Sequence, residues 1–261
     1  MRRQLHATRG AGALPISDST TIRRLHETGL KSRVPALKPY LEPHHKRIRE
    51  AWGLEKIQWD RARWKTCLFT DESRFQLVAG HRRPRVWRRK TERRLDERFV
   101  VRQELFGGGS AMVWGGIAYG MKTPLVIIDG TMTAIRYRDE ILEQHVRPLA
   151  DAAAAGQFLL VDDNARPHRG QVVNRYLTAR AIQRMDWPAK SPDLNPIENL
   201  WGIMKHNVTR RLMPNHTLAD LRRLVLEEWD NIPIELVNKL TMSMNKRARQ
   251  VVEHHGSHID Y

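Results

Sequence analysis

The chain has 261 residues, 41% of them hydrophobic, which allows one large domain with a small appendage. No apolar run approaches the roughly 18 residues of a membrane span, and the single cysteine, Cys67, excludes an internal disulfide framework, so a soluble intracellular protein is expected. Lys and Arg number 45 against 29 acids, a formal charge of +16, which predicts a polyanion such as nucleic acid as partner.

The first forty residues contain one predicted helix, with Ser19 as its N-cap and Gly29 at its end. Arg23 and Arg24 make this helix basic, as in the recognition helix of a helix-turn-helix, although many surface helices have the same character. Residues 47–64 predict a second helix, interpreted as a connector into the main domain. Its expected apolar stripe consists of Ile48, Trp52, Leu54 or Ile57, and Trp59.

Residues 66–77 alternate as a half-buried β-strand does. Asp71 falls on the apolar side of this strand and Glu72 on the polar side. A carboxylate on an apolar face is costly unless something pairs with it. Two interpretations stay open: Asp71 is a turn residue between two hairpin arms, or it is a functional acid. The apolar side consists of Cys67, Phe69, Phe75 and Leu77.

The most basic segment lies at residues 81–94, where Glu92 is the one acid. Such a stripe neutralises phosphates without sequence preference. A solvated basic hairpin and a nuclear-import patch are the alternative interpretations. With the basic pair near the N-terminus, the candidate DNA-binding residues are Arg23, Arg24, Arg82, Arg83, Arg85, Arg88, Arg89 and Lys90.

Further strands are predicted at residues 110–119 and 124–130, as an antiparallel hairpin or meander. A helix follows over residues 133–146, with Thr133 as its cap. Another helix begins at Gln171, and a short strand at Ile182. Together the elements predict a mixed α/β layer rather than a doubly wound sheet or a barrel. The residues of the 133–146 helix expected to point inward are Ile135, Ile141, Leu142 and Val146.

Two aspartates, Asp162 and Asp163, end a short apolar strand that begins at Phe158. Alternation sends them to opposite faces, and the local pattern does not choose between them. A third acid, Glu198, stands at position N3 of a helix that Asn195 is predicted to cap. An acid at N3 is favoured by capping and by the helix dipole, so a structural role alone explains Glu198 locally. The apolar stripe of this helix consists of Ile197, Leu200, Trp201, Met204 and Val208.

Acids delivered by two strands and a helix start can converge on one point, and three clustered carboxylates require cations. Oxygen ligands favour Mg²⁺, which binds through a few carboxylates plus substrate phosphates. Two such ions activate an attacking oxygen and stabilise the leaving oxygen of a phosphodiester. Asp71, Glu198 and one of the paired aspartates therefore form a candidate metal site.

The motifs FTDESRF, VDDNARPH and SPDLNPIENLW resemble the three catalytic blocks of Tc1/mariner-family transposases, and the Tc1 branch in particular. The resemblance implies an RNase H-like catalytic domain, with a mixed sheet flanked by helices and with a triad of Asp71, Asp163 and Glu198. Residues 164–197 separate the last two acids, the 34 residues that the family has there. The choice of Asp163 rests on this match, and Asp162 is expected to point toward solvent or a basic side chain. His168 is expected to form local hydrogen bonds.

The resemblance further implies the activity: two Mg²⁺ ions held by the triad, with Mn²⁺ able to substitute, cleavage at transposon ends, and strand transfer into double-stranded target DNA at TA sites. It divides the chain into a helix-turn-helix remnant (1–40), a helical connector (41–63) and the catalytic domain (64–261). It also implies an N-terminally shortened transposase, a homodimer and a nuclear location. The alternatives are a decayed or domesticated DNA-binding protein that retains the fold, and an RNase H-type nuclease without strand transfer.

Overall fold

The computed structural model of the chain describes residues 17–28, 39–77, 109–154, 157–213 and 215–259. It forms two compact units, Met1–Pro39 and Tyr40–Tyr261. In the first unit, α2 (Asp18–Glu27) is the described helix. Its N-cap is Ser17, whose hydroxyl accepts the backbone N–H of Thr20 at 3.2 Å, so the prediction that Ser19 caps this helix is wrong. Ser17 lies two residues earlier and satisfies an N–H group that would otherwise lack a partner.

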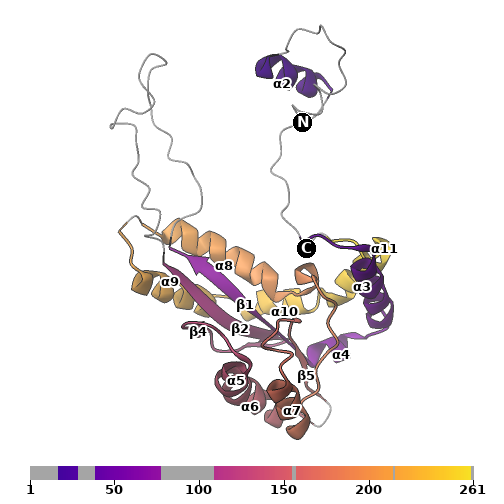
Figure 1. Ribbon diagram of the computed structural model, residues 1–261, viewed down its shortest axis with the longest axis vertical. Helices are drawn as coiled ribbons and strands as arrows, with labels where there is room; N and C mark the ends of the chain where they lie inside the picture. The colour runs from indigo at the N-terminus through magenta and orange to yellow at the C-terminus, as the bar shows by residue number, and fades with distance from the viewer. Residues whose placement is uncertain (1–16, 29–38, 78–108, 155–156, 214, 260–261) are drawn as a thin grey trace. The chain divides into compact units, whose positions relative to one another are not determined.

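The second unit is built on a five-stranded mixed sheet in which β1 is central (Figure 1). Strand β2 pairs with β1 antiparallel, and β5 pairs with β1 in parallel on its other side. The short strands β3 and β4 both pair with β2. The strands are β1 (Cys67–Gln76), β2 (Ser110–Ala118), β3 (Met121–Lys122), β4 (Val126–Ile128) and β5 (Leu159–Val161).

Strand β1 runs unbroken through Asp71, whose partner on β2 is Gly115, and this excludes a hairpin turn at Asp71. Both faces of the sheet are covered, since Leu68 and Thr70 are as buried as the apolar residues of the opposite parity. The strand predicted to begin at Ile182 is reduced to a single parallel bridge between Leu160 and Arg184.

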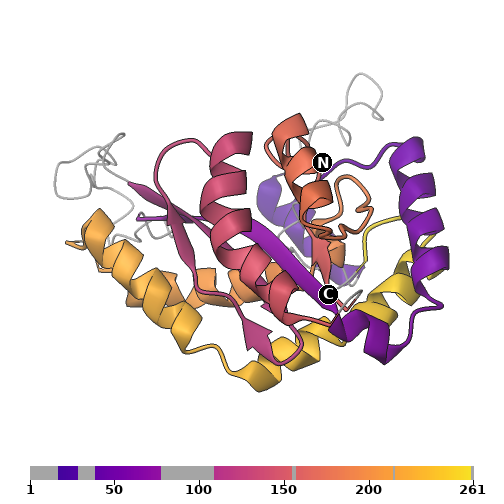
Figure 2. The same ribbon diagram turned by 90° about the horizontal axis from the view of Figure 1, so that it is seen from below.

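Helices pack on both faces of this sheet, in two separate hydrophobic clusters (Figures 1 and 2). None of the described helices is long and apolar enough to cross a membrane. One face carries α3 (Pro43–Lys56), α4 (Arg61–Lys65), α8 (Ile197–Arg211), α9 (Leu218–Asp230), α10 (Ile234–Thr241) and α11 (Met244–Glu253). The other carries α5 (Ala134–Arg136), the π-helix η2 (Tyr137–Val146), α6 (Arg147–Ala152) and α7 (Gln171–Ala179).

The helix predicted over residues 133–146 forms as α5 and η2, and the Thr133 side chain caps it by accepting the N–H of Arg136. Three of the four residues expected to point inward are fully buried, but Ile135 is 59% exposed, so that part of the prediction is wrong. The wider turn of a π-helix shifts the side-chain period, and a 3.6-residue stripe drawn back from Ile141 therefore misses Ile135.

The helix predicted over residues 47–64 is interrupted after Lys56, and its predicted apolar stripe is correct at Trp52 but wrong at Ile48 and Leu54. Ile48 and Leu54 are 52% and 56% exposed, whereas Arg49 is fully buried beside Trp52. The face of α3 that contains Gly53 is buried because it packs closely against α11. A Cβ on Gly53 would lie 2.4 Å from a Val251 methyl carbon. A buried charge on Asp193 adds a second reason, because it requires the Arg49 guanidinium.

Candidate active site

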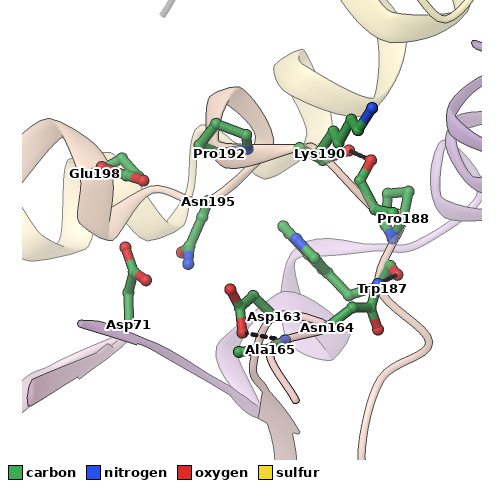
Figure 3. Close-up of a pocket in the computed structure, with 12 residues that line it drawn as sticks. Asp71, Asp163, Asn164, Ala165, Trp187, Pro188, Lys190, Pro192, Asn195 and Glu198 are labelled. Atoms are coloured by element: carbon green, nitrogen blue, oxygen red, sulfur yellow. Dashed lines mark hydrogen bonds between the residues drawn. The ribbon is translucent and has the colours of Figure 1, made fainter. Parts of the chain in front are cut away.

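Three acids from separate elements line one cavity of about 450 Å³ (Figure 3). Asp71 lies within β1, Asp163 two residues beyond the end of β5, and Glu198 in the first turn of α8. Figure 3 shows their carboxylates turned toward the same space. The structure thus brings together the three acids that the sequence motifs single out.

The register of the sheet explains why the first two acids meet. Phe69 on β1 pairs with Val161 on the parallel strand β5. Asp71 and Asp163 each follow two residues later, so they lie side by side and point to the same face of the sheet. Helix α8 is attached to this point by Asn195, whose side-chain amide donates to the carbonyl of Thr70 at 3.1 Å.

The Asp71 carboxylate is held by two donors. The backbone N–H of Glu72 donates to Oδ1 at 2.8 Å, and the indole Nε1 of Trp201 donates to Oδ2 at 3.2 Å. Burial raises the pKa of Asp71 well above its usual range, and the neighbouring charges of Glu198, Glu72 and Asp163 raise it further. The site therefore has a strong negative potential centred on Asp71.

Glu198 does not act as a helix cap. The backbone N–H of Asn195, which a capping box would pair with Glu198, donates instead to the carbonyl of Pro192 at 3.0 Å. The N-cap of α8 is Pro196 and not Asn195 as predicted, although the Asn195 side-chain oxygen accepts the N–H of Ile197 at 3.4 Å and so still satisfies a donor at the helix start. Burial raises the pKa of Glu198, although Lys205 and a hydrogen bond with Asp71 act in the opposite direction. The capping part of the structural interpretation of Glu198 is therefore wrong, whereas its place in the first turn of α8 agrees with the helix-dipole part.

Asp163 has an ordered environment of its own. Its Oδ1 lies 2.8 Å from Nδ1 of His168 and accepts the backbone N–H of Ala165 at 2.8 Å. Burial alone would raise the pKa of Asp163, but these partners outweigh it and hold the pKa below its usual range. Nε2 of His168 lies 3.1 Å from Glu72, so the ring bridges the strand of Asp71 and the loop of Asp163, as local hydrogen bonding predicts.

The charge of His168 follows from these neighbours. Burial alone would lower the pKa of His168, but Asp163 and Glu72 outweigh it and raise the pKa to about 10. The ring is therefore an imidazolium at neutral pH, and it stacks on Tyr137 with 4.1 Å between ring centroids.

Asp162 points to the other face, where it is 1% exposed. Arg169 lies 2.9 Å from one of its oxygens, Arg184 lies 3.9 Å from the other, and the Tyr137 hydroxyl donates to it at 3.2 Å. The expectation of a basic partner is confirmed, and the expectation of solvent is wrong, because the second hydrophobic cluster covers this face.

Sequence reasoning missed two side chains of the site: Trp201, which holds Asp71 without lining the cavity, and Lys190, which lines it. Trp201 was assigned only to the apolar stripe of α8, and nothing in a 3.6-residue pattern indicates where an indole N–H points. Lys190, an exposed cation of the lining, has a positive φ of 55°, which is rare for a residue with a Cβ. The sequence gives no sign of this positive φ, because among common residues only glycine and asparagine adopt it readily.

A second group of ligand-type side chains lies at the start of α3. Glu42, His44 and His45 place their ligand atoms within 4.8 Å of one another, and no other group of three in the described residues is that tight. Both Glu42 and His44 are exposed, and a helix N-terminus disfavours a cation. The carboxylates of the cavity are more widely spaced than this group.

Of the predicted DNA-binding residues, Arg23 and Arg24 lie on α2 with 67% and 71% of their side chains exposed. Glu27 lies 3.8 Å from Arg23 and 2.9 Å from Arg24, so part of their charge is balanced within the helix. The remaining candidates, from Arg82 to Lys90, lie outside the described residues.

Comparisons with known proteins identify the family of the chain. A family model described as a DDE superfamily endonuclease matches residues 66–234, and a model described as a transposase matches residues 3–58. The Tcb2 transposase of Caenorhabditis briggsae is 33% identical over 244 residues, which cover 93% of this chain and 87% of that protein. The Tc1 transposase of Caenorhabditis elegans is 32% identical over 249 residues, 95% of this chain and 89% of that protein.

Solved structures of the Mos1 mariner transposase share the fold. Its paired-end complex with Mn matches with a TM-score of 0.71 at 18% identity, over 94% of this chain and 72% of that chain. Its catalytic domain alone matches with a TM-score of 0.62 at 11% identity, over 86% of this chain and all of that chain. The expected RNase H-like fold, a mixed sheet flanked by helices, is thus confirmed. This chain belongs to the Tc1/mariner family of DNA transposases and carries that family's DDE endonuclease domain.

Proposed function

We propose that Asp71, Asp163 and Glu198 are the catalytic acids of a transposase that cleaves DNA at transposon ends and joins those ends to target DNA. The observation that carries this proposal is the convergence of the three acids on one cavity. Acids from a strand, a loop and a helix meet there. Besides burial, Glu198 and Asp163 raise the pKa of Asp71, and no arginine among the described residues pairs with Asp71 or Glu198.

The donor set fits divalent cations. Three carboxylates offer oxygen ligands, which suit Mg²⁺ and Mn²⁺. The spacing of the acids exceeds that of a single tight group, which favours two ions sharing the three ligands. We therefore propose two Mg²⁺ ions, with Mn²⁺ able to substitute, held by Asp71, Asp163 and Glu198. Bound ions of this kind supply activation of an attacking oxygen and stabilisation of a leaving oxygen.

The chain's own residues orient the acids. The Glu72 N–H and the Trp201 indole hold Asp71, the Ala165 N–H and His168 hold Asp163, and Asn195 fixes the helix start that carries Glu198. Such fixed carboxylates do not need to reorganise when the substrate phosphate arrives, which is the general advantage of a preorganised site.

Two in-line displacements follow from this proposal. In the first, water attacks the phosphorus at the transposon end, and the bond to the 3′-oxygen breaks, leaving a 3′-hydroxyl. In the second, this 3′-hydroxyl attacks a phosphorus of target DNA and displaces a target 3′-oxygen. No covalent bond to the protein forms. A preference for TA target sites fits the easy deformation of that step.

The partners follow from the same proposal. The formal charge of +16 suits double-stranded DNA, and the exposed Arg23 and Arg24 of α2 are candidate backbone contacts. Transposition joins two ends to one target, so we propose a homodimer, in agreement with the paired-end complex described for Mos1. We also propose a nuclear location, which a fluorescent fusion in eukaryotic cells would test.

One assay tests the activity against its alternatives. The protein is incubated with a pre-cut DNA end bearing a 3′-hydroxyl, a plasmid containing TA sites, and Mg²⁺ or Mn²⁺. Joined products that disappear in Asp163→Asn support the proposal. Nicking without joining would indicate a nuclease, and DNA binding without any metal-dependent product would indicate a binding protein that has kept only the fold.

A further inference from the structure

The indole of Trp201 does more than fill the core. Its Nε1 donates to Oδ2 of Asp71 at 3.2 Å, on the side of the carboxylate opposite the Glu72 N–H. Two donors, one on each oxygen, leave the carboxylate little freedom to rotate. The orientation of Asp71 in the cavity therefore depends on Trp201.

Helix α8 supplies both this donor and one of the acids. Trp201 follows Glu198 by three residues, and side chains at that spacing lie on the same side of a helix. A single helix thus delivers the Glu198 carboxylate to the cavity and also holds the Asp71 carboxylate that faces it. Any movement of α8 would displace two of the three acids together.

The indole ring is fixed by its neighbours. Trp201 is 1% exposed, stacks on Trp229 with 5.4 Å between ring centroids, and meets Phe75 edge-on at 6.4 Å. The two indoles occupy space left by Gly115, which pairs with Asp71 across the sheet. A Cβ on Gly115 would lie 3.1 Å from the Trp201 ring and 3.0 Å from the Trp229 ring, so the strand opposite Asp71 is shaped to admit them.

Other tryptophans show that packing alone does not require such a contact. The buried indole nitrogens of Trp52, Trp64 and Trp114 have no hydrogen-bond partner within the described part of the chain. The Trp229 nitrogen donates to the backbone carbonyl of Thr123 at 2.9 Å. Among these buried indoles, Trp201 alone donates to a carboxylate, and that carboxylate is one of the three in the cavity.

We propose that Trp201 is a positioning residue for the divalent-cation site: its indole N–H orients Asp71 toward Glu198 and Asp163 and thereby strengthens cation binding. The inference rests on the proposed function, since it assumes that the three acids hold the cations. Loss of a group that orients a metal ligand typically weakens metal binding by about 10- to 100-fold.

The test compares two buried indoles in the full chain without DNA. Thermal unfolding is followed against Mn²⁺ concentration for wild type, Trp201→Phe and the matched control Trp229→Phe. Both variants keep an aromatic ring and lose an N–H group, so both lower the unfolding temperature without metal. Only Trp201→Phe is expected to raise the Mn²⁺ concentration for half-maximal stabilisation, by about 10-fold or more. A merely structural role for Trp201 would leave this concentration equal to that of Trp229→Phe and would overturn the inference.

Two further variants allow for misfolding of Trp201→Phe and for failure of the proposed cation site. Should Trp201→Phe fail to fold, Trp201 is replaced by 3-benzothienylalanine, which keeps the bicyclic shape and puts sulfur where the N–H stands. An unchanged Mn²⁺ midpoint in that protein overturns the inference, and a raised midpoint supports it. Asp163→Asn distinguishes failure of the proposed cation site from failure of the role of Trp201. If Asp163→Asn abolishes Mn²⁺ stabilisation while Trp201→Phe leaves the Mn²⁺ midpoint unchanged, the cation site is supported and the role of Trp201 is refuted. If wild type itself shows no Mn²⁺ stabilisation, both fall.

Discussion

Asp193 is fully buried and Asp71 is half-buried, and the surroundings of these two acids differ in kind. Asp193 receives two hydrogen bonds from the Arg49 guanidinium, at 2.7 and 2.6 Å, and one from the backbone N–H of Ile259 at 3.0 Å. Burial alone would raise the pKa of Asp193, but Arg49 and these partners hold the pKa below its usual range.

Asp71 has no such counter-charge. Among the described residues no arginine or lysine forms an ion pair with Asp71 or Glu198, and the nearby charges that act on the pKa of Asp71 are acidic. Where this protein buries an acid for structure, it provides arginine, as it also does for Asp162. In the cavity, Asp163 has His168 beside it, but Asp71 and Glu198 have no paired cation among the described residues, which implies that their positive charge is supplied from solution.

The largest expected effect concerns the ion pair between Arg49 and Asp193. Arg49→Met removes a guanidinium that is fully buried and leaves the Asp193 charge unpaired. We expect the free energy of unfolding to fall by about 3–5 kcal/mol, because an uncompensated buried charge is costly. Urea unfolding, with and without Mg²⁺, measures this loss, and the loss should be the same in both conditions.

The double variant Arg49→Met with Asp193→Leu is the control. It removes both charges, so part of the stability should return, although the Ile259 N–H then lacks its acceptor. A double variant less stable than Arg49→Met alone would show that the unpaired charge is not the cause of the loss.

The next effect concerns the cavity. Asp163→Asn keeps the shape of the side chain and removes one proposed ligand, so end cleavage and joining should fall by more than about 100-fold, beyond the loss typical of a group that only orients a ligand. Product formation on the pre-cut DNA end measures this effect. Asp162→Asn cannot serve as a neutral control for activity, because it breaks the buried ion pair with Arg169. We expect its effect to appear as a lower free energy of unfolding. Equal activity in Asp163→Asn and wild type would remove Asp163 from the triad.

The stabilities that Asp71 and Asp193 contribute should also respond to pH in opposite directions. The folded pKa of Asp71 is raised, so its contribution to stability is present below its unfolded pKa and is lost as pH rises through the raised value. The folded pKa of Asp193 is lowered, so its contribution is present above the unfolded pKa and is lost as pH falls through the lowered value.

Metal-free unfolding of wild type, Asp71→Asn and Asp193→Asn at several pH values isolates each contribution. The stability of wild type relative to Asp71→Asn should fall with rising pH, and its stability relative to Asp193→Asn should fall with falling pH. Each unit of pKa separation corresponds to about 1.4 kcal/mol. Slopes of the same sign for both pairs would contradict the contrast between the two acids.

The smallest effect concerns Lys190, the cation in the cavity lining. Its ammonium donates to the carbonyl of Tyr40 at 3.3 Å, so it does not neutralise the acids. Lys190→Gly should relieve the positive φ of 55° and raise the free energy of unfolding by about 0.5–1 kcal/mol, with little change in Mn²⁺ affinity. Lys190→Ala keeps the strain while removing the same charge and should not gain stability. A clear rise in Mn²⁺ affinity in both variants would make Lys190 an internal counter-ion.

Much of the site could be predicted from short-range pattern. The alternation of the first strand placed Asp71 on the buried side, and the helical stripe of residues 197–208 is buried as predicted. Both patterns depend only on where neighbouring side chains point along one element. The choice between Asp162 and Asp163 did not come from local pattern, because two adjacent strand residues differ only in what faces them.

Long-range pairing set the limits of prediction. Arg49 and Asp193 are separated by 144 positions, so no local pattern could reveal that an arginine would displace Ile48 from the buried face of α3. The same holds for Trp201 and Asp71, which are 130 positions apart. Burial of the indole was predictable from periodicity, whereas the partner of its N–H depended on the packing of α8 against β1.

Direct counting of bound Mn²⁺ by electron paramagnetic resonance tests the central claim, that three carboxylates without arginine partners hold divalent cations. Free Mn²⁺ is measured at equilibrium with the full chain, for wild type and for Asp71→Asn. The account predicts two Mn²⁺ ions per wild-type chain, competed by Mg²⁺, and loss of this binding in Asp71→Asn. A wild-type chain that binds no Mn²⁺, or an Asp71→Asn chain that binds as many ions as wild type, would contradict it.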